Sequence, residues 1–311
     1  MSDLSETGIL YTEHADLRAH TPVASLWSYE TCARGPARRA VALTRDGNRE
    51  YWLERTDPLL NTILPGMGVS VVVNFGDLWA AGRSLATSAV LPRVCLVGPV
   101  TQPLILRVGT HVQAIGAAFS STRTASAFGI PPAALVNHIV ALEYVWTPRE
   151  VEELFDVLSS VGVRRRLSKL CRALIARLAP PYGEMVWQAA ARRIKLRGGR
   201  VSIDEMANSH VLSRQEFTRR FSSAAGVPPK LFARITRFQS LVHALLASDV
   251  SRWASVAPAL GFYDQAHMIN EFREFAGSPP TVFFQPHDDT IRTMVQLRGR
   301  PSEWRRRSDM V

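Results

Sequence analysis

The chain has 311 residues, of which 46% are apolar, and this length and composition predict a globular protein with about two domains. Its three cysteines, Cys32, Cys95 and Cys171, lie far apart in the sequence, which argues against a disulfide framework or a zinc cluster. The polar start of the chain and the lack of a long apolar run predict neither a secretory signal nor a membrane span. We therefore expect a cytoplasmic protein.

The net charge of +10 is unevenly distributed along the chain. Residues 1–150 contain 12 basic and 12 acidic side chains, whereas residues 151–180 carry a net charge of +3 and residues 181–311 a net charge of +7. Positive charge concentrated in the C-terminal part indicates a polyanionic partner for that part. Charge alone does not decide the matter, because a solvated basic face is common.

The N-terminal half has the pattern of a β-sandwich or barrel. Short apolar, β-branched runs bounded by Gly or Pro recur there, for example residues 69–77 and 94–100, and such runs are typical of compact β domains. Asp46 and Gly47 separate two apolar runs and predict a hairpin. Residues 129–139 contain two prolines that favour the first turn of a helix.

Catalytic or metal-binding groups do not converge in the N-terminal half. His111 and His138 are isolated in the sequence, so we expect no metal site and no catalytic residues. The aromatic residues admit two interpretations, because they could line a ligand pocket or simply pack in the core: Trp27, Tyr29, Trp52 and Trp79. The sequence identifies no effector-binding residue.

Residues 148–178 change to helical spacing. Apolar residues recur there at intervals of three and four, with Leu167, Leu170 and Leu174 as the clearest series, and the opposite face is basic. Two amphipathic helices in this position could pair with a second subunit to form a homodimer, or could pack on the neighbouring sheet. The sequence leaves both alternatives open.

The C-terminal half contains an internal duplication. The segment FSSAAGVPP at 221–229 has a counterpart 51 residues later, FREFAGSPP at 272–280. The similarity extends upstream, where Ser213 aligns with Asp264 and both residues favour a helix N-cap. Two copies are too few for a stacked solenoid. Each copy predicts two short helices around a tight turn, which is the helix-turn-helix pattern.

A single long helix is expected between the two copies, over residues 230–249, where apolar residues follow one side. Such a rigid connector would fix the distance between the copies. The second helix of each copy could then enter successive major grooves on one face of DNA, about 34 Å apart.

The outward faces of the two second helices carry residues suited to base contacts. Arg, Gln and Asn can each make bidentate hydrogen bonds to base edges. The candidate DNA contacts are Arg214, Gln215, Thr218 and Arg219 in the first copy and Gln265, His267, Asn270 and Arg273 in the second. Arg219 could instead be a solvated surface charge that does not contact DNA. His267 could instead pack against the turn.

Residues 190–287 resemble the DNA-binding domain of the AraC/XylS family of bacterial transcription regulators. The most specific part is GFYDQAHMINEFREFAGSPP at 261–280, and FSSAAGVPP matches the corresponding part of the first unit. The resemblance implies a sequence-specific transcription regulator that reads an asymmetric site on double-stranded DNA. It also implies an N-terminal domain that senses a small-molecule effector or mediates oligomerisation, and RNA polymerase as a partner if the protein is an activator. No cofactor is implied.

By position, the resemblance places base contacts at Gln215, Thr218 and Arg219 in the first unit and at Gln265, His267 and Asn270 in the second. The sequence departs from the family pattern at three positions. Val211 stands where the family usually has the glycine of the first turn, and Pro258 lies inside the helix before the second turn. Asn270 replaces a more common arginine.

The expected fold class is therefore α+β, with a β-rich sandwich or barrel-like domain, linker helices and an all-α domain that carries two helix-turn-helix units on a long helix. The expected boundaries are a sensor or regulatory domain at 1–147, linker helices at 148–183, the DNA-binding domain at 184–287 and a basic flexible tail at 288–311.

Two other function classes share some of these features. A DNA-repair or DNA-modifying enzyme could use the duplicated unit for targeting, but it would need an activated cysteine or a metal, and no such motif is visible. A nonspecific nucleoid-type binder would show a steep salt dependence without sequence preference. We expect a regulator and not an enzyme.

Overall fold

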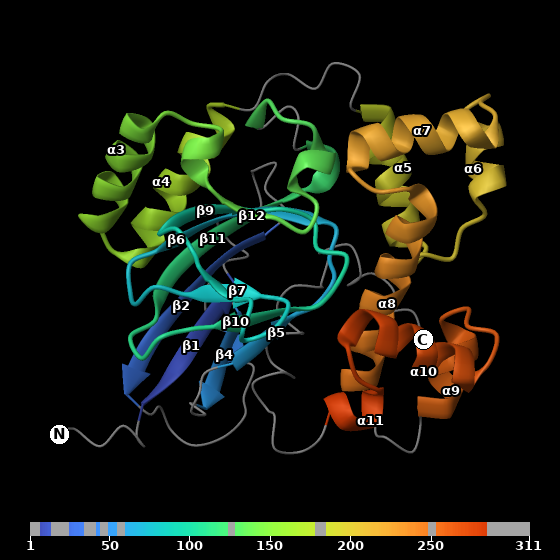
Figure 1. The fold of residues 1–311 in the computed structure, drawn as a ribbon, viewed down its shortest axis with the longest axis horizontal. Coiled ribbons are helices and arrows are strands. Elements are labelled where there is room, and N and C mark those ends of the chain that lie inside the picture. The colour runs from blue at the N-terminus through green and yellow to red at the C-terminus, as the bar shows by residue number, and fades with distance from the viewer. Residues whose placement is uncertain are drawn as a thin grey trace.

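The computed structural model describes residues 7–13, 25–33, 42–43, 49–54, 60–123, 128–177, 185–247 and 253–284. A β-rich N-terminal part is covered on one side by helices, and an all-helical C-terminal part lies beside it (Figure 1). This arrangement confirms the expected α+β class. The tail at 288–311 lies outside the described residues.

The larger sheet has eight antiparallel strands in the order β12-β9-β6-β11-β2-β1-β4-β3. Gly116 lies opposite Trp27 in the register, and a Cβ at Gly116 would fall 2.1 Å from the Trp27 ring, so only glycine lets that ring pack there. The strands are β1 (Thr7–Glu13), β2 (Ser25–Ala33), β3 (Ala42–Leu43), β4 (Arg49–Glu54), β6 (Gly68–Asn74), β9 (Val94–Val97), β11 (Gln113–Ser120) and β12 (Ile139–Ala141).

The predicted hairpin turn at Asp46 and Gly47 lies outside the described residues. The strands on either side of it, β3 and β4, are paired antiparallel, as a hairpin requires.

A second sheet packs against the first. Its four strands are β5 (Leu60–Ile63), β10 (Leu104–Arg107), β7 (Ala80–Gly82) and β8 (Ala89–Val90), in that order. The core between the two sheets contains an aromatic cluster. The centroid of the Tyr29 ring lies 5.0 Å from that of Trp27 and 6.3 Å from that of Trp79, and both pairs are arranged edge-on. These three rings are therefore core residues, and the Trp52 side chain lies outside the described ones.

Two helices cover the other face of the larger sheet: α3 (Pro148–Ser159) and α4 (Val163–Ile175). The leucine series Leu167, Leu170 and Leu174 is buried in one cluster with residues of β6 and β11. The apolar stripe predicted for residues 148–178 thus packs on the sheet. Because both faces of β6 are covered, its consecutive residues Val71 and Val72 are both buried.

α3 begins with a capping box at Thr147 and Glu150. The Glu150 carboxylate accepts hydrogen bonds from the Thr147 backbone N–H and hydroxyl and from Arg177. These bonds stabilise the ionised form and lower the pKa of Glu150 to about 2.

The prediction of a helix that starts within residues 129–139 is wrong about its length. Only a single 3-10 turn, η3 (Pro132–Leu135), forms there. Asn137 then takes a left-handed conformation with φ of 60°, and its side chain is hydrogen bonded to the backbone N–H and the hydroxyl of Thr101. This tertiary anchor ends the helical turn just before β12 begins. Two further 3-10 turns are η2 (Ser121–Arg123) and η4 (Leu142–Tyr144).

The C-terminal part is helical throughout its described residues. The predicted long connector is confirmed as α8, of 19 residues, and it runs between an upper group of helices and a lower group (Figure 1). The helices are α5 (Met185–Leu196), α6 (Ile203–Ser209), α7 (Arg214–Ala225), α8 (Pro229–Ala247), α9 (Trp253–Ala259), α10 (Gln265–Ala276) and α11 (Pro280–Phe283).

The β-rich part and the helical domain are in direct contact. Met67, between β5 and β6, is buried in the core cluster of the helical domain. The Gln239 side chain of α8 donates a hydrogen bond to the Pro65 carbonyl oxygen at 3.1 Å. At the end of α7, the backbone of Gly226 packs against Pro132. The N-terminal part therefore touches both the connector helix and the end of α7.

Candidate nucleic-acid interface

The first helix-turn-helix unit consists of α6, a short turn and α7. Ser202 caps α6 and Ser213 caps α7, and each hydroxyl accepts a hydrogen bond from a backbone N–H three residues later. Val211 lies in the turn with φ of 55°, which is the conformation that glycine would adopt most easily. The turn therefore has the expected geometry even though a β-branched residue occupies it.

The second unit repeats this geometry with α9 and α10. Gly261 provides the left-handed residue of the turn, with φ of 79°. The next residue, Phe262, donates its backbone N–H to Ala257, just as Leu212 donates to Ala207 in the first unit. One additional residue, Tyr263, separates this point from the cap Asp264, and its side chain is 91% exposed.

Pro258 does not shorten α9. This helix has seven residues, the same length as α6, and Pro258 occupies its second-to-last position. Proline at this position removes one backbone donor from the helix, and α9 nevertheless keeps its seven residues.

The four candidate residues on α7 lie on its accessible side. Arg214, Gln215 and Arg219 are exposed, and Thr218 is half-buried. The Arg214 guanidinium forms an ion pair with Asp204 of α6 at 3.1 Å. The inward side of the helix buries Phe217 and Phe221, as well as Ala225.

Arg219 is held by a neighbour that sequence reasoning did not single out. Its guanidinium donates two hydrogen bonds to the Glu216 carboxylate, at 2.7 and 2.8 Å. Arg220 donates to the same carboxylate. Hydrogen bonds from Arg219 first and Arg220 second lower the pKa of Glu216 to about 2. The spacings of three and four residues were a sequence signal for these pairs.

The four candidate residues on α10 are also exposed: Gln265, His267, Asn270 and Arg273. These four side chains differ in the number of contacts that they make with other residues of the protein. His267 contacts its own domain through both ring nitrogens, since Nδ1 accepts from the Tyr263 N–H at 3.3 Å and Nε2 lies 3.4 Å from the Glu271 carboxylate. Among the described residues, the side chains of Gln265, Asn270 and Arg273 have no such partner.

Glu271 was also missed by the sequence reasoning. It lies on the inward side of α10 and is 4% exposed, and it is paired with Arg237 of α8. A surface hollow of about 460 Å³ lies beside it between α8 and α10, and Lys230 and Asn270 contribute to the lining. The signal in the sequence was a charged residue at a position where the helical period places apolar ones.

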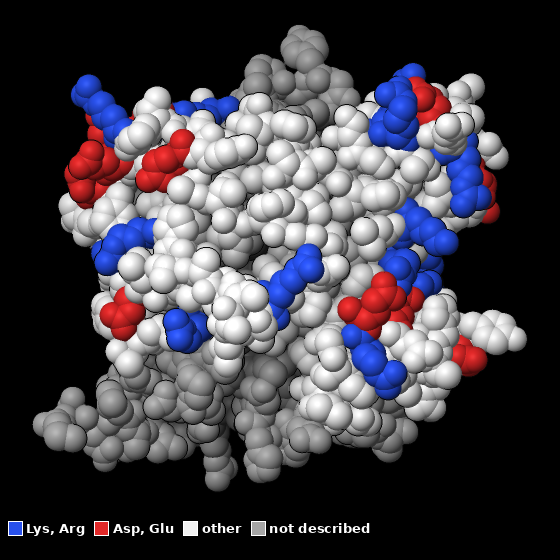
Figure 2. Space-filling model, in the orientation of Figure 1, with Lys and Arg blue, Asp and Glu red and all other residues white. Residues whose placement is uncertain are grey.

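Basic side chains lie at several places on the helical domain. In Figure 2, Lys and Arg lie at several places along the helical domain, some of them beside carboxylates. Arg200, in the loop before α6, donates a hydrogen bond to the Ala259 carbonyl oxygen at the end of α9 and so connects the two units. Exposed arginine and lysine side chains suit contacts to the phosphate backbone of a nucleic acid.

A family model described as a helix-turn-helix domain matches residues 206–285. The matched segment begins in α6 and extends past α11, so it contains α7, α8 and α10. The part of the chain that carries both units is therefore similar to a helix-turn-helix domain. No curated protein sequence matches the chain.

Solved structures similar to this chain include ToxT from Vibrio cholerae. One has unsaturated fatty acid bound and is 8% identical, with a TM-score of 0.39 and coverage of 72% of this chain and 92% of that one. Another, from strain O395, is 7% identical, with the same TM-score and coverage of 72% and 95%.

In the parts of the chain that the structure describes, three or more His, Cys, Asp or Glu side chains are nowhere grouped to hold a metal ion. The described helices include none with the length and apolarity needed to cross a bilayer.

Proposed function

We propose that this protein is an AraC-type transcription regulator that reads an asymmetric DNA site by placing α7 and α10 in the major groove at two adjacent half-sites. The supporting observation is the repeated geometry of the two units. Each of these helices follows a turn with a left-handed residue, begins at a polar cap and buries an apolar side while polar residues face outward. The connector α8 sets their separation.

Arg219 and Asn270 are the principal base readers in this proposal. Both are exposed at equivalent positions, 51 residues apart, and both side chains can bond a base edge in a bidentate manner. Gln215, Thr218 and Gln265 lie on the same accessible sides. Arginine side chains and the helix N-termini provide contacts to phosphate, which supply affinity without sequence preference.

The β-rich part acts as the regulatory domain. Its core contains an aromatic cluster, and the Trp79 Nε1 donor is buried with no hydrogen-bond partner among the described residues. This unpaired donor is the polar group in the core that an acceptor atom of a small-molecule effector would satisfy. Contacts of Met67 and Gln239 between the two parts give a path from this domain to α8.

The other proposed properties follow from DNA binding. A protein that reads chromosomal sites works in the cytoplasm of a bacterium, and an activator would also contact RNA polymerase. A homodimer through residues 148–178 would have to use the outer, charged faces of α3 and α4, because their apolar stripe is buried against the sheet.

Selection of tight binders from a random DNA library at physiological salt tests the proposal. The intact protein should enrich a bipartite consensus with half-sites about one helical turn apart. Arg219→Ala should cost about 1–3 kcal/mol of binding free energy and relax the preference at one base. Arg220→Ala is the matched control, since it removes the same charge from the same helix and should weaken all sequences alike.

Enrichment of no sequence by the intact protein, with or without ligands of the β-rich domain, would overturn the proposal in favour of nonspecific binding. Cys95 and Cys171 are buried, which disfavours either of them as the nucleophile of a DNA-modifying enzyme, because a nucleophilic thiol must be accessible. The Cys32 side chain lies outside the described residues. Transfer of an alkyl group from damaged DNA to the protein would contradict the regulator assignment.

A further inference from the structure

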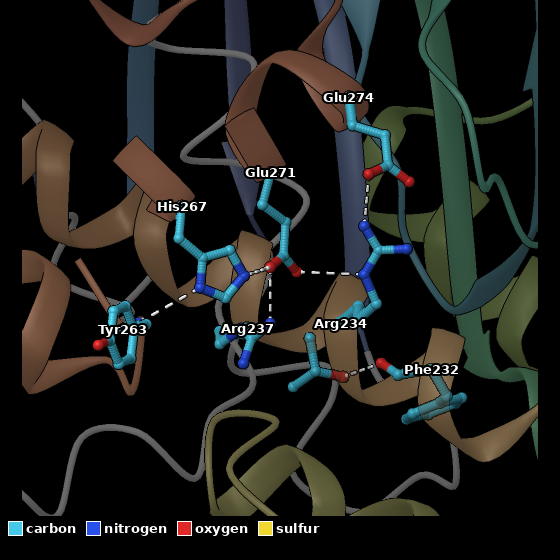
Figure 3. Close-up of polar contacts among 8 residues, drawn as sticks. Phe232, Arg234, Arg237, Tyr263, His267, Glu271 and Glu274 are labelled. Carbon is cyan, nitrogen blue, oxygen red and sulfur yellow. Dashed lines mark hydrogen bonds and ion pairs between the residues drawn. The ribbon is translucent and has the colours of Figure 1, made fainter. Parts of the chain in front are cut away.

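Glu271 is the one buried carboxylate among the residues whose burial is described. Three nitrogen-bearing side chains converge on it (Figure 3). Arg237 Nη2 donates to Oε2 at 2.6 Å, His267 Nε2 lies 3.4 Å from Oε2 and Arg234 Nε lies 3.5 Å from Oε1. Taking a carboxylate out of water is costly, so these partners are what make its burial tolerable.

The partners of Glu271 come from different elements. Arg234 and Arg237 lie one turn apart on α8, whereas His267 lies one turn earlier on α10. Arg237 also lies over the Phe262 ring, 4.8 Å from its centroid, and Phe262 belongs to the turn before α10. A single carboxylate therefore joins the connector helix, the second recognition helix and its turn.

The first unit lacks this arrangement. The position equivalent to Glu271 is Arg220, which is exposed, and the position equivalent to His267 is Glu216. Here α7 is joined to α8 through a turn of three residues, 226–228, so the chain itself fixes the angle between the two helices.

The second unit depends on side-chain contacts with α8 for its orientation. The Phe238 ring contacts Phe272 and Phe275, with ring centroids 5.5 and 5.3 Å apart. Apolar contacts hold the helices together but are not directional. The hydrogen bond from Arg237 to the Glu271 carboxylate has a defined direction. Together with the longer contacts to Arg234 and His267, it selects one rotation of α10 against α8.

We propose that Glu271 is a positioning residue that fixes the angle of α10 on α8 and thereby the spacing of the two DNA half-sites that the protein accepts. This inference rests on the proposed function. Glu271 is buried and does not touch DNA. A buried ion pair adds little net stability, because desolvation offsets the attraction, but it can favour one conformation over its alternatives.

His267 also takes part in the contacts of Glu271 that position α10. Its Nδ1 accepts from the Tyr263 N–H, and its Nε2 lies 3.4 Å from the Glu271 carboxylate. Both nitrogens are then used within the protein. His267 therefore orients the turn and the helix, and Asn270, one turn further along α10, reads the base.

The experiment measures binding to DNA in which the two half-sites, identified with the wild-type protein, are separated by spacers that vary in steps of one base pair. Wild type should show one sharply preferred spacer. Glu271→Gln should keep both half-site sequences, whereas the ratio of affinity for the best spacer to that for its neighbours should fall by about tenfold. Glu274→Gln is the control, because Glu274 contacts Arg234 from the exposed side of α10.

Circular dichroism and thermal unfolding establish that each variant is folded. If Glu271→Gln does not fold, the double variant Glu271→Leu, Arg237→Met replaces the pair by apolar residues of similar volume. It should show the same broadened spacer profile. A folded variant with the wild-type spacer profile would overturn the inference and leave the proposed function intact. If wild type enriches no pair of half-sites, the proposed function fails, and the inference fails with it.

Discussion

Gly226 and Gly277 end α7 and α10 in the same backbone conformation, with φ of 83° in both and ψ of −15° and −14°. Each backbone N–H closes the helix by donating to a carbonyl oxygen four residues earlier, Ser222 in one unit and Arg273 in the other. The two residues differ only in their surroundings. A Cβ at Gly226 would lie 2.9 Å from the Pro132 carbonyl carbon, whereas at Gly277 the nearest atom, Pro103 Cγ, would be 3.8 Å away.

This difference predicts unequal costs for the same substitution. Gly277→Ala should lower the free energy of unfolding by about 1 kcal/mol, because alanine is strained at positive φ. Gly226→Ala should cost about 2 kcal/mol or more, since the added methyl group must also displace Pro132. Urea denaturation of the two intact variants measures both values. Equal costs would show that Pro132 does not pack on α7 in solution.

Replacing Val211 with glycine should raise the free energy of unfolding, whereas the two Gly→Ala substitutions should lower it. A β-branched residue at φ of 55° is strained by about 1–2 kcal/mol, and because its side chain is 92% exposed, little packing would be lost on its removal. Val211→Gly should therefore raise the free energy of unfolding by about 1 kcal/mol after the entropy cost of glycine. Val157→Gly, on the accessible side of α3, is the control and should destabilise by about 1 kcal/mol. If Val211→Gly lowered the free energy of unfolding, the backbone of Val211 would not be strained in the wild-type protein.

Sequence reasoning located the duplicated unit because the local signals were strong. The caps Ser213 and Asp264, the apolar period around Phe217 and Phe221 and the repeated Gly and Pro residues all indicate the same element boundaries. When local signals agree in this way, they identify elements well. The β-sandwich followed for the same reason, from short runs such as β6 and β9 bounded by turn residues.

Tertiary contacts were beyond these local signals. The sequence could not decide whether Leu167 and Leu170 face a sheet or a second subunit, because both surroundings require the same apolar stripe. It also missed Glu271, whose burial depends on Arg237, 34 residues away. The helix expected at 129–139 failed because the contact between Asn137 and Thr101 overrides its local helical preference.

The pairing of Glu216 with Arg219 predicts a measurable titration. The pKa of Glu216 is lowered from 4.5 to about 2 in the folded protein, so the ionised carboxylate favours the folded state. Its contribution to stability is fully present above about pH 4.5 and is lost as the pH falls toward 2. NMR titration of Glu side-chain carboxyl carbons follows this group directly.

Arg219→Ala should raise the pKa of Glu216 toward its usual range, and adding Arg220→Ala should raise it further, because each guanidinium donates to the same carboxylate. Arg214→Ala is the matched control: Arg214 lies on the same helix but pairs with Asp204, so the Glu216 titration should not move. A Glu216 pKa near 4.5 in the wild-type protein would show that Arg219 is not held by this carboxylate. Above that pH, the intact pair keeps the Arg219 guanidinium ordered on the outer side of α7, which reduces the entropy lost when it bonds a base.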